Sequence, residues 1–394
     1  MELKKTTLGE LSVDNKGYYG IAASAVDYSE DLYTYLRITD INDDGTINFD
    51  GLKSVDDDKA SQYLLKPNDI VFARTGASTG RNYFYDGSDG TFVYAGFLIK
   101  FSIDPTKVNP KFIKYFCLSD KYRGWIQSFT TGSTRGNINA KTLGDMVVEI
   151  PPKEQQDKMV EILSIIDEKI KLNNRINNNL EQQARAIYQN LFENIDSLPT
   201  GWKKVSLGEV ANISNKSFNP LKEPETLLEH YSIPAYDDTK FPVFEFSSEI
   251  KSNKFIIDDS CFMISKLNPT TKRVWRPYCI TDNAVCSTEF IVYKAKEESM
   301  TDYLYSVINS DTFSNFMCSH VTGSTGSRQR TTPKDTLFFE VIIPTEEELN
   351  TFQSTVAPIY AQMRFIAIEN SKLKEIRDIL LPKLMSGEID VSNI

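Results

Sequence analysis

The chain has 394 residues, of which 40% are hydrophobic and 25% charged, and its formal net charge at pH 7 is −10. This length allows two or three domains, and the composition excludes collagen, a disulfide-stabilised miniprotein and a wholly disordered chain. No eighteen apolar residues run together, and no apolar run follows the basic pair near the start, so we expect a soluble, cytoplasmic protein. The five cysteines form no CxxC pair and are expected to be reduced thiols.

A long repeat predicts that the chain is a tandem duplication. The segment Lys4–Leu11 returns as Lys203–Val210 with five of eight residues identical, and Thr131–Thr134 returns unchanged as Thr322–Thr325. The matches keep the same order, and their offsets stay between 191 and 199 residues. Such a pattern indicates two copies of one domain that differ by loop insertions and deletions.

Each copy is predicted to be a β-rich domain followed by a long helix, which makes the fold class α+β. Short apolar runs such as 69–74 and 289–293 are separated by Gly, Asn and Asp turns, which favours strands, whereas 110–119 and 301–309 are typical of helices. The predicted parts are a first domain at 1–150, a first helical region at 151–198, a second domain at 199–344 and a second helical region at 345–394.

The segment Asp40–Asn48 matches the start of a calcium-binding loop, but its twelfth position is Gly51 instead of glutamate. A hairpin turn through Asp44 and Gly45 is therefore the favoured interpretation. The loop Thr75–Arg81 has three residues between its glycines where a phosphate-binding P-loop needs four. We expect neither metal nor nucleotide to bind these loops.

Apolar residues spaced alternately four and three apart predict one long helix in each helical region, beginning near Met159 and Phe352. We expect the two helices to pack as an antiparallel coiled coil. Asn177 and Asn370 hold equivalent positions and are predicted to fix the register near the crossing point. The alternative is that each Asn faces solvent or a docked partner.

The second helix also carries signals for its ends. Thr345–Glu348 fits a capping box, and Gly387 lies where a C-terminal cap is expected. Pro358 and Pro382 lie inside the pattern and are expected to bend or interrupt the helix.

The chain offers no recognisable catalytic site. It lacks G-x-S-x-G and H-E-x-x-H motifs, and its only two histidines, His230 and His320, both lie in the second copy. A duplicated histidine-based site is therefore excluded, and we expect the chain not to be an enzyme.

Both copies share polar loops rich in Gly, Ser, Thr and long cations, which we predict to contact DNA. Arg can bind guanine edges, Asn and Gln can bind adenine, and Ser and Thr can hold phosphates. The alternative is that these loops are ordinary solvated turns. The candidate contact residues of the first copy are Arg74, Thr75, Ser78, Thr79, Arg81, Ser133, Thr134, Arg135 and Asn137. Those of the second copy are Lys266, Lys272, Arg273, Ser324, Thr325, Arg328, Gln329 and Arg330.

Charge is segregated along the first copy. Residues 71–141 hold ten Lys and Arg against four Asp and Glu, whereas 40–58 hold seven Asp against Lys53 alone. A basic face on an acidic body is thus possible although the whole chain is acidic.

Several segments resemble the DNA specificity subunit of type I restriction and modification systems, over essentially the whole chain. Their order and duplication, more than any one of them, carry the resemblance. They are Lys4–Leu11, Leu198–Val210, Tyr35–Asp40, Ile150–Gln156 and the tail Ile379–Ile389.

The resemblance implies that each β-rich domain is a target recognition domain that reads one half of a bipartite, asymmetric DNA site. The two helices would set the spacer between the halves and dock two adenine methyltransferase subunits, which restriction subunits join. S-adenosylmethionine, ATP and magnesium would belong to those partners, and this chain would bind no cofactor. The loops differ, Arg135–Asn137 against Gly326–Arg328, so the two half-sites should differ as well.

Two alternatives remain open on the sequence. One is the specificity subunit of a type IIB-like system, and the other is a duplicated protein-binding scaffold. The net charge of −10 disfavours a lone DNA binder, because phosphate neutralisation supplies much of the affinity for DNA. We therefore expect weak, salt-sensitive DNA binding by the isolated chain and tight binding only in the complex.

Overall fold

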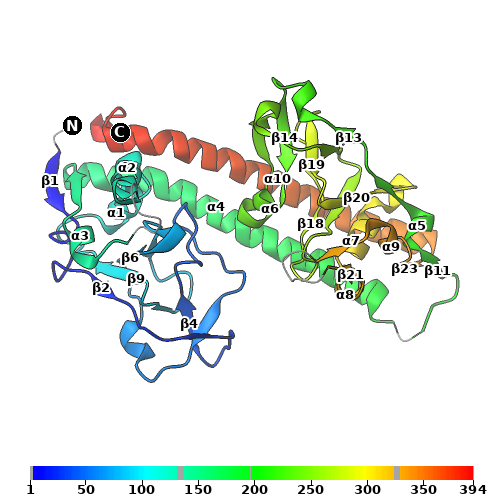
Figure 1. Cartoon of the computed structure of the whole chain (residues 1–394), viewed down its shortest axis with the longest axis horizontal. Helices are drawn as coiled ribbons and strands as arrows, with labels where there is room; N and C mark the ends of the chain where they lie inside the picture. Colours follow the sequence, from blue (N-terminus) through cyan, green and yellow to red (C-terminus); the bar gives the residue numbers. More distant parts are fainter. Residues whose placement is uncertain (1–2, 131–136, 196, 324–328, 394) are drawn as a thin grey trace. The chain divides into compact units, whose positions relative to one another are not determined.

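The computed structural model describes residues 3–130, 137–195, 197–323 and 329–393. The chain divides into two compact units, one of Met1–Lys169 with Leu373–Ile394 and one of Ile170–Lys372. We call these unit 1 and unit 2 (Figure 1). The division falls inside both long helices, so the four-part division expected from the sequence stays a prediction.

Besides its parts of the two long helices, unit 1 has in its described residues two four-stranded sheets, a strand pair and three short α-helices. The first sheet is antiparallel and has the order β2 (Tyr18–Tyr19), β9 (Leu98–Ser102), β6 (Asp69–Ala73) and β7 (Asn82–Tyr85). The second has the order β3 (Ala25–Val26), β5 (Lys53–Val55), β4 (Tyr33–Leu36) and β8 (Phe92–Tyr94). The other elements are the pair β1 (Lys4–Thr7) and β10 (Val147–Ile150) and the helices α1 (Pro110–Phe116), α2 (Asp120–Thr130) and α3 (Ala140–Gly144).

Unit 2 repeats this plan with additions. Its first sheet has the order β12 (Ala211–Ser214), β20 (Phe290–Ala295), β17 (Cys261–Ser265) and β18 (Val274–Trp275). Its second has the order β13 (Ser217–Phe218), β16 (Lys254–Ile256), β19 (Ala284–Ser287), β14 (Leu227–Tyr231) and β15 (Val243–Phe246). The strand pairs are β11 (Lys203–Ser206) with β23 (Glu340–Ile343) and β21 (Val321–Thr322) with β22 (Arg330–Thr331). The short helices are α5 (Leu207–Val210), α6 (Ile233–Thr239), α7 (Thr301–Ile308), α8 (Asp311–Ser319) and α9 (Pro333–Thr336).

The two units confirm the predicted duplication. The order β2-β9-β6-β7 matches β12-β20-β17-β18, and both sheets are antiparallel. The second sheet of each unit contains one parallel pair, β4 with β8 and β14 with β19. The helices expected at 110–119 and 301–309 are present as α1 and α7.

Side-chain caps explain where short helices start in each unit. The Asn109 side chain accepts a hydrogen bond from the Lys111 amide at the start of α1, where Pro110 holds the first position. In unit 2 the Ser310 side chain accepts from the Phe313 amide at the start of α8. In unit 1 α1 packs on β7, in unit 2 α8 packs on α7, and Phe112 and Phe313 are buried in the respective cores.

The two long helices, α4 (Lys153–Tyr188) and α10 (Glu346–Ser386), contribute to both units. In unit 1, Gln155 hydrogen-bonds to Ser392, and Asp167 pairs with Arg377. In unit 2, Asn173 contacts Asn370. Asn177 of the same helix as Asn173 contacts Met363. In each unit, a higher residue number on α4 thus goes with a lower residue number on its partner, so the two helices run antiparallel there.

The apolar residues spaced four and three apart form the predicted seam between the helices, and most of them are buried, including Met159 and Leu163 in unit 1 and Phe352 and Val356 in unit 2. Leu191 holds the last position of the four-and-three spacing in the first helix and is therefore expected to be buried, but it is exposed and Phe192 is buried instead. The reason is a π-helical turn at Gln189–Glu193, which shifts the phase of the last turn.

The ends of α10 are as predicted, but its prolines do not interrupt it. The Thr345 amide donates to Glu348 Oε2 at 3.0 Å, and the Glu348 amide returns a bond to Thr345 Oγ1 at 3.4 Å. Gly387 has φ +77°, the left-handed conformation of a C-terminal cap. Pro358 and Pro382 are exposed, so water can bind the carbonyl groups that they leave without a helical partner.

The predicted hairpin turn at Asp44 and Gly45 is confirmed. Ile41 and Ile47 form an antiparallel bridge, the Asn42 amide donates to the Thr46 carbonyl oxygen at 2.9 Å, and Gly45 has φ +76°. Within the described ranges, no helix combines the length and the apolar character that a membrane crossing needs.

Candidate nucleic-acid interface

In unit 1 the two polar loops predicted from distant parts of the sequence lie side by side. Thr75 and Asn137 form an antiparallel bridge. The Ile138 amide donates to the Arg74 carbonyl oxygen at 2.9 Å, and Arg74 Nη2 donates to Asn137 Oδ1 at 3.5 Å. The loop that leaves β6 is thus joined through its backbone to the chain that follows α2.

Unit 2 has the same junction at equivalent positions. Leu267 and Arg330 form the corresponding bridge, and the Thr331 amide donates to the Lys266 carbonyl oxygen at 3.1 Å. The Asn268 amide donates to the Gln329 carbonyl oxygen at 2.9 Å. The backbone frame of the polar loops is therefore duplicated together with the sheets.

Local sequence explains the path of the first loop. Gly76 and Gly80 have φ +74° and +89°, which a residue with a Cβ rarely adopts. A Cβ at Gly80 would also lie 2.6 Å from the Ile126 side chain of α2. The Tyr122 hydroxyl donates to the Gly80 carbonyl oxygen at 2.6 Å, so the end of this loop is tied to α2.

Arg74 lies in an aromatic setting that the sequence analysis did not identify. Its guanidinium stands 5.2 Å from the centre of the Tyr19 ring, a cation–π contact, and its amide donates to the Phe97 carbonyl oxygen at 3.1 Å. Both aromatic side chains are exposed. Tyr19 and Phe97 are far from Arg74 in sequence, so only the register of β2, β9 and β6 brings them together.

The corresponding site in unit 2 carries different side chains. The Lys266 amide donates to the Glu289 carbonyl oxygen at 2.9 Å, so Glu289 takes the place of Phe97. The Glu289 carboxylate receives Arg330 Nε at 3.0 Å and Nη2 at 3.3 Å. Arg330 in turn occupies the position of Asn137. One frame therefore presents an aromatic residue and an amide in unit 1 but an ion pair in unit 2.

Besides Arg330, whose side chain is 44% exposed, three less exposed predicted contact residues are bound to carboxylates inside their own unit. Arg81 pairs with Asp43 at 2.7 and 3.1 Å, and the equivalent Arg273 pairs with Asp237 at 2.5 and 2.8 Å. These contacts give the three cations a role in bracing their own unit, and their contact with DNA stays a prediction. The third is Lys272, whose ammonium lies 3.2 Å from Asp311 and whose pKa is lowered by burial.

The other predicted contacts are either hydroxyl residues of the first loop or residues outside the described ranges. Thr75 and Ser78 are partly buried in the loop, and the Thr79 hydroxyl donates to the Gly76 carbonyl oxygen at 2.7 Å. The remaining predicted contacts lie outside the described residues, namely Ser133, Thr134, Arg135, Ser324, Thr325 and Arg328.

The two predicted register residues do not pair with each other. Asn370 receives Asn173 Nδ2 at 2.8 Å and donates to Asn174 Oδ1 at 2.8 Å. Asn177 instead donates to the Met363 carbonyl oxygen at 3.4 Å. The polar pair of the seam in unit 2 is therefore Asn173 with Asn370, one helical turn from the predicted position.

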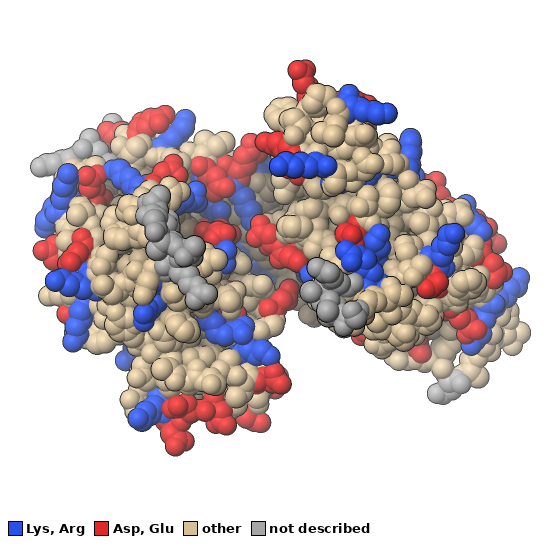
Figure 2. Space-filling model, in the orientation of Figure 1, with Lys and Arg blue, Asp and Glu red and all other residues tan. Residues whose placement is uncertain are grey.

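Figure 2 shows Lys and Arg interspersed with Asp and Glu over the face of each unit. In the described ranges, no group of three or more His, Cys, Asp or Glu is placed to hold a metal ion. The polar loops can offer hydrogen bonds and cations to a ligand.

A family model described as a type I restriction modification DNA specificity domain matches residues 3–182. The chain is 22% identical over 421 residues to the type I restriction enzyme HindI specificity subunit of Haemophilus influenzae, which covers 82% of this chain and 87% of that protein. It is 21% identical over 332 residues to the MjaIX specificity subunit of Methanocaldococcus jannaschii, which covers 72% and 70% of the two chains.

Among solved structures, the S subunit of a type I restriction-modification system from M. genitalium is similar, with a TM-score of 0.56 and 16% identity. The match covers 98% of this chain and 96% of that one, and at this identity it speaks for a shared fold.

Proposed function

The chain belongs to the family of type I restriction-modification specificity subunits, and on that premise we propose that it is the non-catalytic subunit that recognises DNA for a methylating and restricting complex. The observation that carries the proposal is the duplicated junction of polar loops, Thr75 with Asn137 in unit 1 and Leu267 with Arg330 in unit 2. Two equivalent frames with different side chains suit a bipartite target whose halves differ.

We assign base reading to the polar side chains at the two junctions. Arg74 and Asn137 present donors suited to guanine and adenine edges in one half-site, and Lys266, Gln329 and Arg330 do so in the other. Thr75 and Ser78 are assigned to phosphate contacts. Thr79 would join them only if its hydroxyl turned away from the Gly76 carbonyl oxygen, to which it donates. The residues outside the described ranges keep their predicted roles as contacts, whereas Arg81, Lys272 and Arg273 brace the loops.

The proposed protein partners are two adenine methyltransferase subunits on the helices, with restriction subunits joining that core. Exposed apolar residues on the helices support a docking role, since such residues mark interaction surfaces when they gather. In unit 1 they are Ile165, Ile376 and Ile379, and in unit 2 they are Leu172, Ile176 and Phe365. The antiparallel helices would also set the spacing between the two half-sites.

The reaction chemistry is assigned to the partners. S-adenosylmethionine, ATP and magnesium would be bound by the methyltransferase and restriction subunits, and this chain would hold none of them. The complex would act in the cytoplasm, where it meets both the host chromosome and incoming DNA.

The test is a genome-wide map of adenine methylation by single-molecule sequencing. Cells that carry this chain with its partner methyltransferase are compared with cells that lack only this chain. We expect a split motif with a fixed gap that disappears on deletion. An unchanged methylation pattern, with the methyltransferase shown to be active, would contradict the proposal.

A further inference from the structure

Unit 1 has a groove on its second sheet, away from the polar loops, with a volume of about 1050 Å³. It is built from the β3–β4 connection, the turn after β5 and the start of β8. Val55, Ala60 and Phe92 form a buried apolar floor. The groove therefore has a defined base and is more than a gap between surface side chains.

The wall of the groove carries three exposed aromatic side chains. Tyr28 is 56% exposed, Phe49 is 55% exposed and Tyr33 is 40% exposed. The backbone of Tyr33 pairs with that of Val55 across β4 and β5, which fixes the start of this wall against the floor. Aromatic residues gathered in this way at a surface mark a binding site, because their exposure has a cost in water.

The rest of the lining is strongly acidic. Six carboxylates line the groove, and no Lys or Arg of the described chain does so. Three of them, Asp56, Asp57 and Asp58, follow β5 directly. Lys53, the one cation in the acidic stretch 40–58, is held by Asp27 at 2.7 Å. Figure 2 shows Asp and Glu gathered at the lower edge of unit 1, in the region where Figure 1 places β4.

We infer that this groove binds an arginine-rich segment of a protein partner. Guanidinium groups pair with carboxylates and stack on aromatic faces, so they satisfy both features of the lining at once. The groove is larger than one side chain requires, which favours several cations on one chain. DNA does not suit this surface, because six carboxylates repel phosphate.

The inference is tested with the full-length chain and fluorescein-labelled hexa-arginine, by fluorescence anisotropy. We expect binding that Asp56→Asn with Asp58→Asn weakens about fivefold through the loss of two ion pairs. Asp57 is left intact because its carboxylate accepts the Lys59 amide at 2.8 Å and shapes the turn. The matched control, Glu346→Gln with Glu347→Gln in unit 2, removes two carboxylates elsewhere and should leave the affinity unchanged.

A second pair of variants removes aromatic side chains from the wall and leaves all six carboxylates of the groove in place. Phe49→Ser and Tyr28→Ser should each weaken hexa-arginine about threefold by loss of stacking, and hexa-lysine should bind more weakly than hexa-arginine. Thermal melting checks that each variant is folded.

Three outcomes would overturn the inference. The first is equal weakening by the control substitutions in unit 2, which would mean unspecific attraction to an acidic protein. The second is unchanged binding by both aromatic variants. The third is spermine binding as tightly as hexa-arginine with the same response to every variant, which would make a small free cation the occupant.

Discussion

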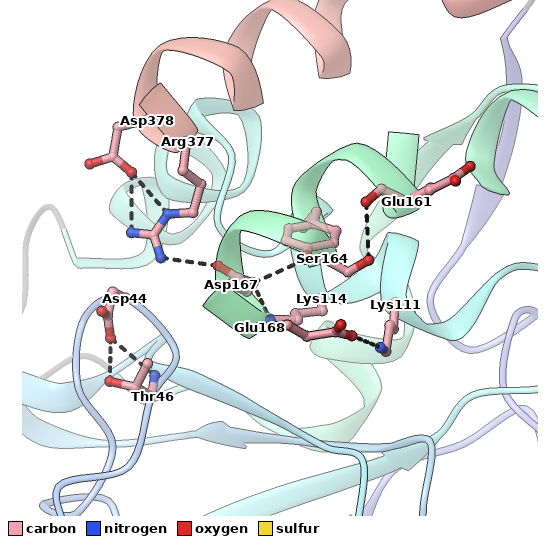
Figure 3. Close-up of polar contacts among 11 residues, drawn as sticks. Asp44, Thr46, Lys111, Lys114, Glu161, Ser164, Asp167, Glu168, Arg377 and Asp378 are labelled. Atoms are coloured by element: carbon pink, nitrogen blue, oxygen red, sulfur yellow. Dashed lines mark hydrogen bonds and ion pairs between the residues drawn. The ribbon is translucent and has the colours of Figure 1, made fainter. Parts of the chain in front are cut away.

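Arg377 of α10 reaches Asp167 of α4, with Nη1 3.4 Å from Oδ1, inside unit 1 (Figure 3). The same carboxylate receives Lys114 Nζ at 2.5 Å and the Tyr115 hydroxyl at 3.0 Å, both from α1. Asp167 therefore joins the two long helices to α1 of unit 1. Its side chain is only 18% exposed, so the contacts are largely shielded from water.

Asp167→Asn should lower the free energy of unfolding by about 2 to 3 kcal/mol, because it leaves Lys114 without its carboxylate and Arg377 with the more exposed Asp378 alone. Burial raises the pKa of Asp167, but Lys114, Arg377 and Tyr115 outweigh it and hold that pKa below its usual value. A lowered folded-state pKa contributes stability above the unfolded-state value of about 3.9, and this contribution is lost as the pH falls further. Urea unfolding at pH 7 and below pH 4 measures both effects.

Glu168→Gln is the matched control for this prediction. Glu168 lies next in the chain and pairs with Lys111 at 3.6 Å, but its side chain is 70% exposed. Such a surface pair contributes at most about 1 kcal/mol. A loss for Glu168→Gln as large as that for Asp167→Asn would contradict a special role for Asp167.

The pair Asn173 and Asn370 in unit 2 should show strong coupling. Asn370→Leu alone leaves the buried amide of Asn173 without one of its partners, which costs about 1 to 3 kcal/mol. Replacing both residues by Leu removes the polar pair altogether and should recover most of that loss. A double-mutant cycle by urea unfolding measures the coupling, and additive losses would refute it.

Arg81→Ala and Arg273→Ala should change stability more than specificity. Each residue is bound by an aspartate of its own unit, so we expect a loss of about 0.5 to 1 kcal/mol from the ion pair. The methylated motif should stay the same at every base. Thermal melting and methylation sequencing check the two halves of this prediction, and a relaxed motif would show that these arginines touch bases after all.

The isolated chain should bind DNA weakly and with strong salt dependence, because its net charge is −10. We expect the affinity to fall steeply between 50 and 200 mM salt, and the assembled complex to bind far more tightly at the higher salt. Fluorescence anisotropy with target and scrambled duplexes measures both. Tight, target-selective binding by the chain alone at 200 mM salt would contradict this division of labour.

The sequence predicted the architecture well because the duplication repeats both motifs and spacing. Lys4–Leu11 and Lys203–Val210, for example, carry the equivalent strands β1 and β11. The sequence did not reveal which cations form ion pairs with carboxylates of their own unit. Arg81 and Asp43 are 38 residues apart, and only the folded hairpin at Gly45 brings them together.

The details of the helices also depended on packing. A spacing rule places Asn177 and Asn370 in equivalent seam positions but does not give the stagger of two antiparallel helices, and that stagger selects Asn173 as the partner. Likewise, the exposure of Tyr19 and Phe97 beside Arg74 depends on strand register, which no single segment encodes.

The most direct test of the central claim, one half-site for each unit, is methylation sequencing of cells whose complex carries either Arg74→Ala or Arg330→Ala. The account predicts that each variant relaxes base preference in one half of the split motif, that the two variants affect different halves, and that the gap keeps its length. Relaxation of the same half by both variants would contradict it, as would an unchanged motif for either one.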